Sequence, residues 1–492
     1  MYQKIKEYFE VHKQEMLDDI MAAIRIPSVN GPEKPGMPFG EENAKVLAFA
    51  ASLAKELGLK AEVLENKVAV IDLNEQPAEL DILAHLDVVP AGDGWTVTEP
   101  FVPVIRDGRL YGRGSSDDKG PAIAALYAMK AVKDLGVTLT KNARLILGAD
   151  EETACRDTEY YYSKFAEAPC SFSPDAEYPL INIEKGGLYT KYSAQWKEET
   201  ALPRLISLNG GTAGNVVPNR AEAVVEGLSG EIIRDICRKT ENETGIHFTV
   251  EPVLPDVSAN QGERWFIHAT GTSTHASTPW EGNNAVTGLI KAAASLPLSD
   301  SAGFRTLNGL AEIFPHNDYY GVAAGVAQKD EISGDLTLGT NMVDYQVTGL
   351  MGKIDSRAPL CASKENMLDV LRARLDAEGI QMDPESRMTP PHHVPEDKPF
   401  VQTLLSCYEQ VMGEKGYCMA IGGGTYSRLL ENAITFGVIF PGERPRPEGL
   451  PATHGSAHGP DEFTYIPDFL RAAEIYALAL VLLDEAAEEA GA

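Results

Sequence analysis

The 492-residue sequence has few basic residues for its size. It contains 43 Lys and Arg against 72 Asp and Glu, which gives a formal net charge of -29. Nucleic-acid phosphates are bound largely through Lys and Arg that displace counterions, so this balance argues against nucleic acid as a partner. It also disfavours binding to anionic membrane surfaces. The composition is typical of an acidic, well-solvated protein surface.

Paired cysteines and long apolar runs are also missing. The six cysteines are scattered and none forms a CxxC pair, so neither a thiolate zinc site nor a disulfide framework is indicated. The N-terminal 21 residues are interrupted by charges every few positions and hold no apolar signal core. The longest late apolar run, Ile475 to Leu483, is far short of a bilayer span. We therefore expect a cytoplasmic protein with no membrane partner.

The length favours two domains, and the first part of the chain alternates helix and strand patterns. A helical pattern over 41–57 ends at a glycine, and the pattern over 121–136 has Pro in its first turn and a Gly stop. Apolar runs at 79–89 and 143–152 indicate buried strands that end in polar residues. Such alternation predicts an open, largely parallel α/β sheet.

The middle of the chain follows a different pattern. Alternating segments such as RAEAVVEGL and ERWFIHATG indicate strands, and helical runs lie near 283–295 and 364–378. Three later elements predict the return of the first domain: a helix at 400–412, a strand at 433–440 and a closing helix at 466–490. We therefore predict one α/β domain from 1–186 and 389–492, with an α+β domain inserted at 187–388.

Polar clusters occur where predicted strands end or where a predicted helix begins. They contain His85, Asp87, Asp117, Asp118, Glu151, Glu152 and Asp175, and the returning segment adds His458. Ligand sites of open parallel sheets gather beyond the carboxyl ends of the strands, so these clusters can converge. Each cluster also has a simpler explanation, since Asp117 and Asp118 could cap a helix and the adjacent Glu pair could form a solvated surface.

Two histidines and three carboxylates together suit a pair of divalent cations. Imidazole with carboxylate fits zinc or its first-row neighbours, whereas a shell of carboxylates alone would suit magnesium or calcium. Asp117, Glu152 and Asp175 supply three negative charges against the four positive charges of two dications. One bound hydroxide would neutralise the remainder and is the nucleophile that a hydrolase needs.

Four segments resemble, in order and spacing, the motifs of the co-catalytic di-zinc exopeptidases: LAHLDVVPAGDGW, EPFVPVIRDGRLYGRGSSDDKGP, ADEET and SPDAEYPLINIEKG. That family includes glutamate carboxypeptidases, succinyl-diaminopimelate desuccinylases, aminoacylases and carnosinases. DDKGP, DAEYPLI, GGGTYSR (422–428) and the large middle domain are most similar to its bacterial peptidase V-type dipeptidases. The resemblance covers nearly the whole chain and implies a catalytic α/β domain with an inserted lid, acting on dipeptides. Ala84 stands where glycine is common in the family, which removes no ligand.

The resemblance also implies a role for individual residues. The implied metal ligands, for two Zn²⁺ or alternatively Mn²⁺ or Co²⁺, are His85, Asp117, Glu152, Asp175 and His458, with Asp117 bridging. Asp87 would orient His85, and Glu151 would be the general base. His275 in GTSTHASTP would stabilise the oxyanion of the tetrahedral intermediate. The implied substrate-binding residues are Asn215, Arg357, Gly424 and Tyr426.

Several alternatives stay open at this level. His275 could instead cap a turn, Arg357 could pair with Asp355, and His454 could replace His458 as a ligand. The spacing of HGPDEF favours His458. His392 and His393 are interpreted as structural residues or as residues at the edge of a cleft.

The resemblance further implies a dipeptidase that releases the N-terminal amino acid. A middle domain of this size implies that the lid histidine comes from the same chain, and hence a monomer, with a homodimer as the alternative. The same centre could serve an N-acyl amino acid deacylase or a carboxypeptidase. A non-catalytic peptide- or metal-binding protein is disfavoured by Glu151, because binding needs no general base.

Overall fold

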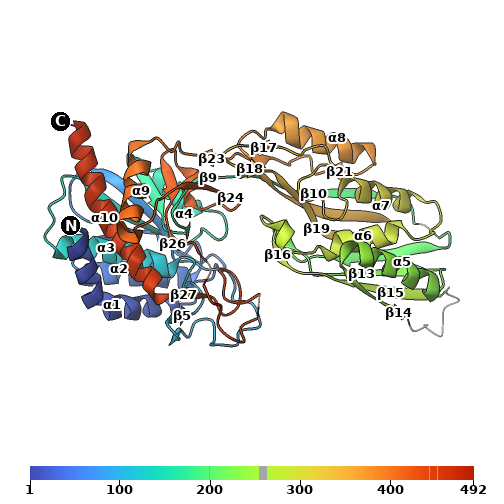
Figure 1. The fold of residues 1–492 in the computed structure, drawn as a ribbon, viewed down its shortest axis with the longest axis horizontal. Helices are drawn as coiled ribbons and strands as arrows, with labels where there is room; N and C mark the ends of the chain where they lie inside the picture. The colour runs from blue at the N-terminus through green and yellow to red at the C-terminus, as the bar shows by residue number, and fades with distance from the viewer. Residues whose placement is uncertain (199, 254–262, 443, 452, 492) are drawn as a thin grey trace. The chain divides into compact units, whose positions relative to one another are not determined.

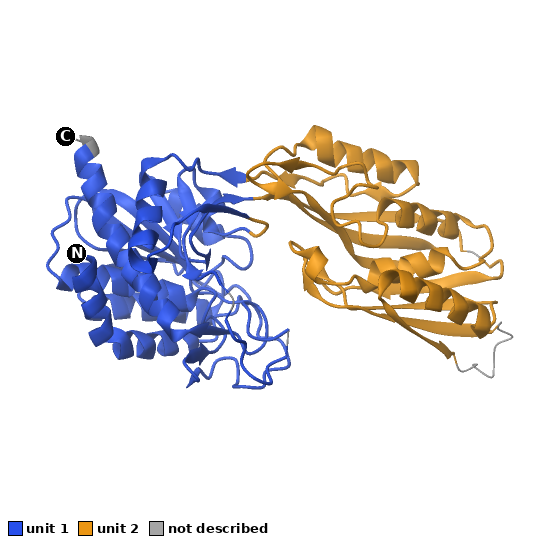
Figure 2. Cartoon of the chain, in the orientation of Figure 1, with its two compact units in different colours: residues 1–184, 392–420, 424–492 blue, residues 185–391, 421–423 orange. Residues whose placement is uncertain are grey.

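A computed structural model describes residues 1–198, 200–253, 263–442, 444–451 and 453–491 (Figure 1). The chain forms two compact units, shown in Figure 2, and each is described by itself. Unit 1 comprises Met1–Glu184, His392–Ala420 and Gly424–Ala492. Unit 2 comprises Lys185–Pro391 and the short segment Ile421–Gly423, which the domain bounds predicted from the sequence assign to the α/β domain.

Unit 1 is built on a nine-stranded sheet in the order β1-β2-β6-β3-β7-β25-β9-β23, with β24 paired to β9. The strands are β1 (Lys60–Leu64), β2 (Val68–Asp72), β3 (Ala78–His85), β6 (Asn142–Gly148), β7 (Cys170–Ser173), β9 (Leu180–Glu184), β23 (His392–His393), β24 (Cys418–Ile421) and β25 (Ala433–Thr435). The four central strands β6, β3, β7 and β25 are parallel. β1, β2, β9 and β23 join antiparallel.

The α/β class predicted from the sequence is confirmed, but the sheet is mixed rather than largely parallel. Only its centre is parallel. The connection between β1 and β2 spans just residues 65–67, which is too short for a crossover and makes the pair an antiparallel hairpin. The predicted strand at 433–440 is divided into β25 and β26 (Val438–Ile439) by Gly437, whose φ is +89°.

Six α-helices are described in unit 1: α1 (Tyr2–Ile24), α2 (Glu41–Glu56), α3 (Lys119–Asp134), α4 (Arg156–Tyr162), α9 (Pro399–Met412) and α10 (Ile466–Gly491). α3 packs against α1 and α10, and the core between helices and sheet includes Ile82, Ala124 and Tyr476. Smaller pairings join β4 (Val104–Arg106), β5 (Arg109–Tyr111) and β27 (Phe463–Tyr465), and β8 (Ala176–Glu177) with β26. Among the described residues, no helix has both the length and the apolar character needed to cross a bilayer.

Unit 2 contains an antiparallel sheet in the order β14-β15-β13-β11-β19-β20-β10-β21, with β22 paired to β10. Its strands are β10 (Gly186–Gln195), β11 (Arg204–Gly210), β13 (Arg220–Glu226), β14 (His247–Pro252), β15 (Arg264–Thr270), β19 (Thr337–Gln346), β20 (Gly349–Ala358), β21 (Gln381–Met382) and β22 (Met388–Thr389). Two short ladders pair β12 (Val216–Val217) with β16 (Thr274–His275) and β17 (Lys329–Asp330) with β18 (Gly334–Asp335).

Four α-helices are described in unit 2: α5 (Gly230–Thr244), α6 (Ala285–Ala294), α7 (Ala302–Ile313) and α8 (Asp369–Ala377), the last continuing a π-helical turn at Lys364–Leu368. α6 packs on β11, β13, β15 and β19. Side chains of β10 alternate between the helix-covered face of the sheet and its other face: Leu188 and Tyr192 belong to the core, whereas Tyr189 and Lys191 are exposed. The sheet therefore has one face in the core and one open face.

Candidate metal centre

Three parallel strands of unit 1 end at one edge of the sheet, and polar residues follow each of them. β3 ends at His85, Glu151 and Glu152 follow β6, and Asp175 follows β7. His85 is the direct neighbour of Gly148, the last residue of β6. Asp117 lies just before α3. The carboxyl ends of the strands therefore bring together residues that are far apart in the sequence.

Among the described residues, two groups of side chains lie close enough to hold a metal ion, and they share Asp117. In the first group, Nε2 of His85 lies 3.0 Å from Oδ1 of Asp117 and 3.5 Å from Oδ2 of Asp175. In the second, Nε2 of His458 lies 2.9 Å from Oδ2 of Asp117 and 3.2 Å from Oε2 of Glu152. Asp117 thus offers one carboxylate oxygen to each group, as a carboxylate that bridges two cations does.

The donor atoms of this cluster are better suited to bind a pair of cations than to form hydrogen bonds with one another. Nε2 of His85 is buried and has no hydrogen-bond partner, although two carboxylate oxygens lie nearby. Burial and the negative charge of Asp117 raise the pKa of Asp175 to about 7. Burial lowers the pKa of His458, but hydrogen bonds to Asp117 and Glu152 outweigh it and raise that pKa to about 11. Such competition for protons is relieved by dications, and imidazole with carboxylate suits zinc or another first-row metal.

Asp87 and Asp118 position the first of these ligands. Nδ1 of His85 lies 3.0 Å from the backbone oxygen of Asp87 and 3.4 Å from its carboxylate, while that carboxylate accepts the backbone N–H groups of Glu151 and Glu152 at 3.2 and 3.1 Å. Asp118 precedes α3 but makes no capping hydrogen bond, and its carboxylate instead accepts the backbone N–H of His85 at 3.0 Å. The interpretation of Asp118 as a helix cap is therefore wrong.

Glu151 lies beside the cluster and belongs to neither candidate ligand group. Burial is the main cause that raises its pKa well above the usual range, and the negative charges of Asp175 and Glu152 act in the same direction against the lowering effect of His85. A carboxyl group with a raised pKa is suited to accept a proton and return it within one reaction cycle.

The C-terminal segment distinguishes between the two histidines that the sequence left open. Nδ1 of His454 lies 2.7 Å from Oδ2 of Asp461, and His454 belongs to neither candidate group. Asp461 in turn accepts hydrogen bonds from the backbone and hydroxyl of Thr96. His458, by contrast, lies beside Asp117. The geometry thus favours His458 as the candidate ligand and gives His454 a structural environment.

Glu462 is a positioning residue that the sequence did not reveal. Its carboxylate is fully buried and pairs with Arg113 at 2.6 Å. It also accepts backbone N–H groups from the loop before α3, at Gly114, Ser116 and Asp117. This residue therefore connects the segment that carries His458 with the loop that carries Asp117. The only signal in the sequence was an acid downstream of His458 in HGPDEF.

Tyr426, a predicted substrate-binding residue, is buried beside His85. It is only 1% exposed, its hydroxyl donates to Oδ2 of Asp157 at 2.6 Å, and its ring makes an edge contact with His85. A side chain buried in this way supports His85, and the role of Tyr426 in binding a substrate stays a prediction. Gly424 is exposed, and a side chain there would collide with the guanidinium of Arg428.

The remaining histidine pair lies at the edge of the unit 1 sheet. Nε2 of His392 lies 2.7 Å from the backbone oxygen of Ala433, which links β23 to β25, the strand on the other side of β9. His393 is exposed. Neither residue belongs to a candidate ligand group among the described residues. The environment of His392 is that of a structural residue.

In unit 2, a short ladder brings Asn215 next to His275. β12 follows Asn215 directly and pairs with β16, which ends at His275, and the backbone oxygen of Asn215 accepts the N–H of Ala276 at 2.9 Å. Ser277 contacts Nδ1 of His275 twice, through its hydroxyl at 2.6 Å and its backbone N–H at 3.3 Å. Because a backbone N–H can only donate, Nδ1 must be an acceptor, and the neutral imidazole carries its proton on Nε2.

Arg357 is held by partners inside unit 2. Its guanidinium binds both carboxylate oxygens of Asp355, at 3.1 and 3.2 Å, and donates a further hydrogen bond to the backbone oxygen of Gly422. The pairing with Asp355 that the sequence left open is therefore present. A side chain at Gly422 would meet Ser277, so the segment Ile421–Gly423 lies between Arg357 and the residue that contacts His275.

Comparison with known proteins places these residues in a family. The chain is 35% identical to YtjP of Bacillus subtilis strain 168 over 478 residues, which cover 95% of this chain and 97% of that protein. It is 32% identical to the Beta-Ala-Xaa dipeptidase of Lactobacillus delbrueckii subsp. lactis, with 96% and 97% covered. The fold is similar to human carnosine dipeptidase 1, with a TM-score of 0.57, 14% identity, and 98% and 99% covered. Residues 82–481 match the model of peptidase family M20/M25/M40. The chain belongs to this peptidase family.

Proposed function

We propose that this chain is a metal-dependent dipeptidase whose two cations share Asp117. One cation would be held by His85, Asp117 and Asp175, and the other by Asp117, Glu152 and His458. The observation that supports this assignment most strongly is that the two carboxylate oxygens of Asp117 face different imidazoles, at 3.0 and 2.9 Å. Zinc suits this donor set best, and Mn²⁺ or Co²⁺ are the alternatives.

Two bound cations would polarise the carbonyl of the scissile bond and lower the pKa of a water molecule. Glu151 would take a proton from that water and deliver it to the departing amine, for which its raised pKa suits it. Asp87 would fix the positions of the general base and of two metal ligands. Its carboxylate accepts the backbone N–H groups of Glu151 and Glu152, and its backbone oxygen orients His85.

His275 would stabilise the negative oxygen that develops on the substrate carbonyl. The contacts of Ser277 support this role, because they leave the proton of the neutral ring on Nε2, where it can be donated. The role requires no charge on the imidazole.

Asn215 and Arg357 would hold the substrate. Asn215 is exposed next to His275, which favours direct contact. The contacts to Asp355 and Gly422 use three of the five N–H groups of Arg357, which leaves one on Nη1 and one on Nη2 to bind a substrate carboxylate. Gly424 would form part of the same loop.

Dipeptides are the substrate class that the relatives support. The Lactobacillus relative is named for cleavage of Beta-Ala-Xaa dipeptides, and a structure with the same fold is a carnosine dipeptidase. A deacylase of N-acyl amino acids or a carboxypeptidase would use the same centre. We further propose a cytoplasmic monomer that releases the N-terminal amino acid; analytical ultracentrifugation tests its assembly state.

One assay distinguishes these activities. The metal-loaded protein is incubated with dipeptides, tripeptides and N-acetyl amino acids, with and without a chelator, and Glu151→Gln serves as the inactive control. We expect turnover of dipeptides that the chelator abolishes. Preferred turnover of N-acetyl amino acids or tripeptides would replace the dipeptidase assignment, and full activity in the chelator would refute the metal centre.

A further inference from the structure

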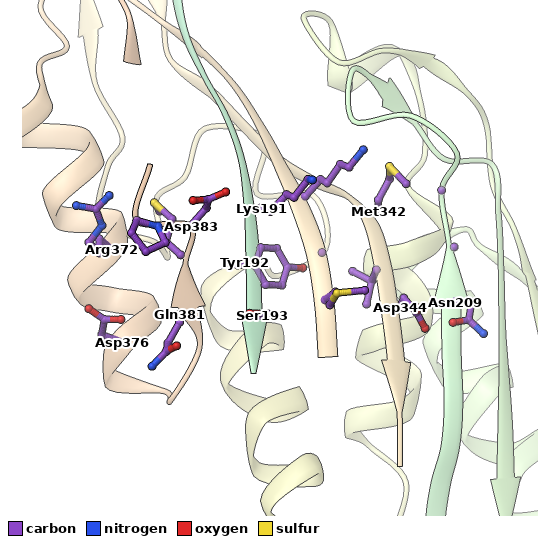
Figure 3. Close-up of a pocket in the computed structure, with 18 residues that line it drawn as sticks. Lys191, Tyr192, Ser193, Asn209, Met342, Asp344, Arg372, Asp376, Gln381 and Asp383 are labelled. Carbon is purple, nitrogen blue, oxygen red and sulfur yellow. The ribbon is translucent and has the colours of Figure 1, made fainter. Parts of the chain in front are cut away.

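Unit 2 contains a groove that is lined by none of the candidate site residues. Its volume is about 1120 Å³, and Figure 3 shows its lining side chains over the strands β10, β19 and β11. The floor includes Lys191, which is exposed, and Met351, which is 60% exposed, so it belongs to the open face of the sheet. Arg372 of α8 lies at one margin. The size is sufficient for a small organic molecule.

Two lysines lie directly opposite each other on this floor. Lys191 of β10 is the register partner of Lys353 of β20, and Met342 of β19 is the next residue across. Side chains at such positions have Cβ atoms about 5 Å apart, and like charges placed there destabilise the sheet. The strand pairing therefore keeps two positive charges close together at a cost.

In the part of the chain that the structure describes, neither lysine forms an ion pair with a carboxylate. Within the described parts of the chain, no ion pair or side-chain hydrogen bond is made by Lys191, Lys353 or Arg372, and Nη2 of Arg372 is buried without a partner. The groove is also lined by Asp344, Asp376 and Asp383, and among the described residues none of them forms an ion pair. Asp344 accepts from Gln346, and Asp383 accepts the backbone N–H of Glu385. Three acids of the lining match these three cations in number, but the two lysines face each other across the strand pair and not an acid.

The next row of the floor has a different character. This row lies two residues further along each strand from the lysine pair. Met351 lies between its register partners Ser193 and Asp344, Asn209 is the next residue beyond Asp344, and Gln381 is the next beyond Ser193. This row offers hydroxyl, amide and carboxylate groups around one exposed apolar side chain. It can donate and accept hydrogen bonds, and Met351 supplies an adaptable apolar contact.

We propose that this groove binds a phosphorylated small organic molecule. The phosphate would lie between Lys191 and Lys353, and Arg372 would contribute from the margin. Two lysines suit a doubly charged phosphate, because each acts as a point charge with several donors. The polar organic part would lie on the row of Ser193, Met351 and Asp344. This binding site is independent of the peptidase activity.

Ribose 5-phosphate, inorganic phosphate, succinate and ribose test the proposal by isothermal titration calorimetry on the full chain at low salt. We expect saturable binding of ribose 5-phosphate, at least tenfold weaker binding of inorganic phosphate and of succinate, and none of ribose. The affinity should fall as salt rises, because exposed charges are screened. Equal affinity for inorganic phosphate would refute the organic part of the ligand, and absence of saturable binding by either phosphate would refute the site.

A double variant, Lys191→Gln with Lys353→Gln, locates the binding. We expect at least a tenfold loss of ribose 5-phosphate affinity, with an unfolding temperature equal to or above that of the parent, since the repulsion is removed. The matched control is Lys291→Gln, which changes a lysine of the same unit that is paired with Glu243 on the helical side. Unchanged affinity in the folded double variant, or an equal loss in the control, would overturn the proposal.

Discussion

The candidate metal centre of unit 1 and the groove of unit 2 differ in how their charges are arranged. In unit 1, imidazoles and carboxylates from several strand ends converge and share oxygens, so opposite charges compensate one another. In unit 2, Lys191 and Lys353 lie opposite each other with no acid between them. Strand ends of a parallel sheet collect residues whatever their sequence spacing, whereas the neighbours on an antiparallel sheet depend on register. The difference teaches that the first kind of site is visible in a sequence and the second is not.

The largest effect is expected from Asp117→Ala, which removes the residue common to both ligand groups. We expect the loss of at least one metal per chain and of nearly all turnover, measured by elemental analysis and a dipeptide assay. Asp107→Ala, an exposed position, is the control and should retain both. Two metals per chain in the Asp117 variant would show that Asp117 is not a ligand shared by both cations.

Glu151→Gln separates proton transfer from metal binding. Because Glu151 belongs to neither ligand group, we expect both metals to be retained while turnover falls by about 10²–10⁴-fold. Stopped assays at substrate saturation measure this change, with Glu65→Gln as an exposed control. A near-normal rate would show that another group moves the proton.

His275→Ala extends the comparison to unit 2. We expect turnover to fall by about 10²–10³-fold with metal content unchanged, since an oxyanion donor acts on the transition state and not on the metals. His268→Ala, a partly exposed histidine of the same unit, is the control. A loss of thermal stability with normal turnover would instead indicate a structural histidine.

Ser277→Ala should have the smallest effect of the four. The variant loses the hydroxyl contact to Nδ1 of His275 but keeps the backbone N–H, so we expect about a tenfold fall in kcat, equivalent to about 1.4 kcal/mol, with KM and metal content unchanged. Ser277→Thr retains the hydroxyl and should restore the rate. If both variants lose activity equally, crowding rather than the hydrogen bond is responsible.

The sequence predicted much of unit 1 because its signals are local. Apolar strands that end in acids or histidines indicated the edge where His85, Asp117 and Asp175 meet, and the family resemblance is confirmed by the match to peptidase family M20/M25/M40. Whether these residues bind metal stays a prediction. The antiparallel flanks and the division of the 433–440 strand depend on turn geometry at 65–67 and Gly437, which apolar runs do not reveal.

The contacts that position the candidate ligands could not be predicted from the sequence, because they join segments that are far apart in the chain. Glu462 binds the loop before Asp117 across more than 340 residues of chain, and Tyr426 is buried behind His85 by its hydrogen bond to Asp157. The register that faces Lys191 with Lys353 is likewise set by the whole sheet. The residue type indicates which groups a side chain can bind, but only the fold determines which group it actually contacts.

Anomalous diffraction at the zinc absorption edge, from crystals grown with zinc, tests the central claim most directly. The account predicts two peaks about 3.5–4 Å apart, with one oxygen of Asp117 on each. A single peak, or two peaks that Asp117 does not connect, would contradict it.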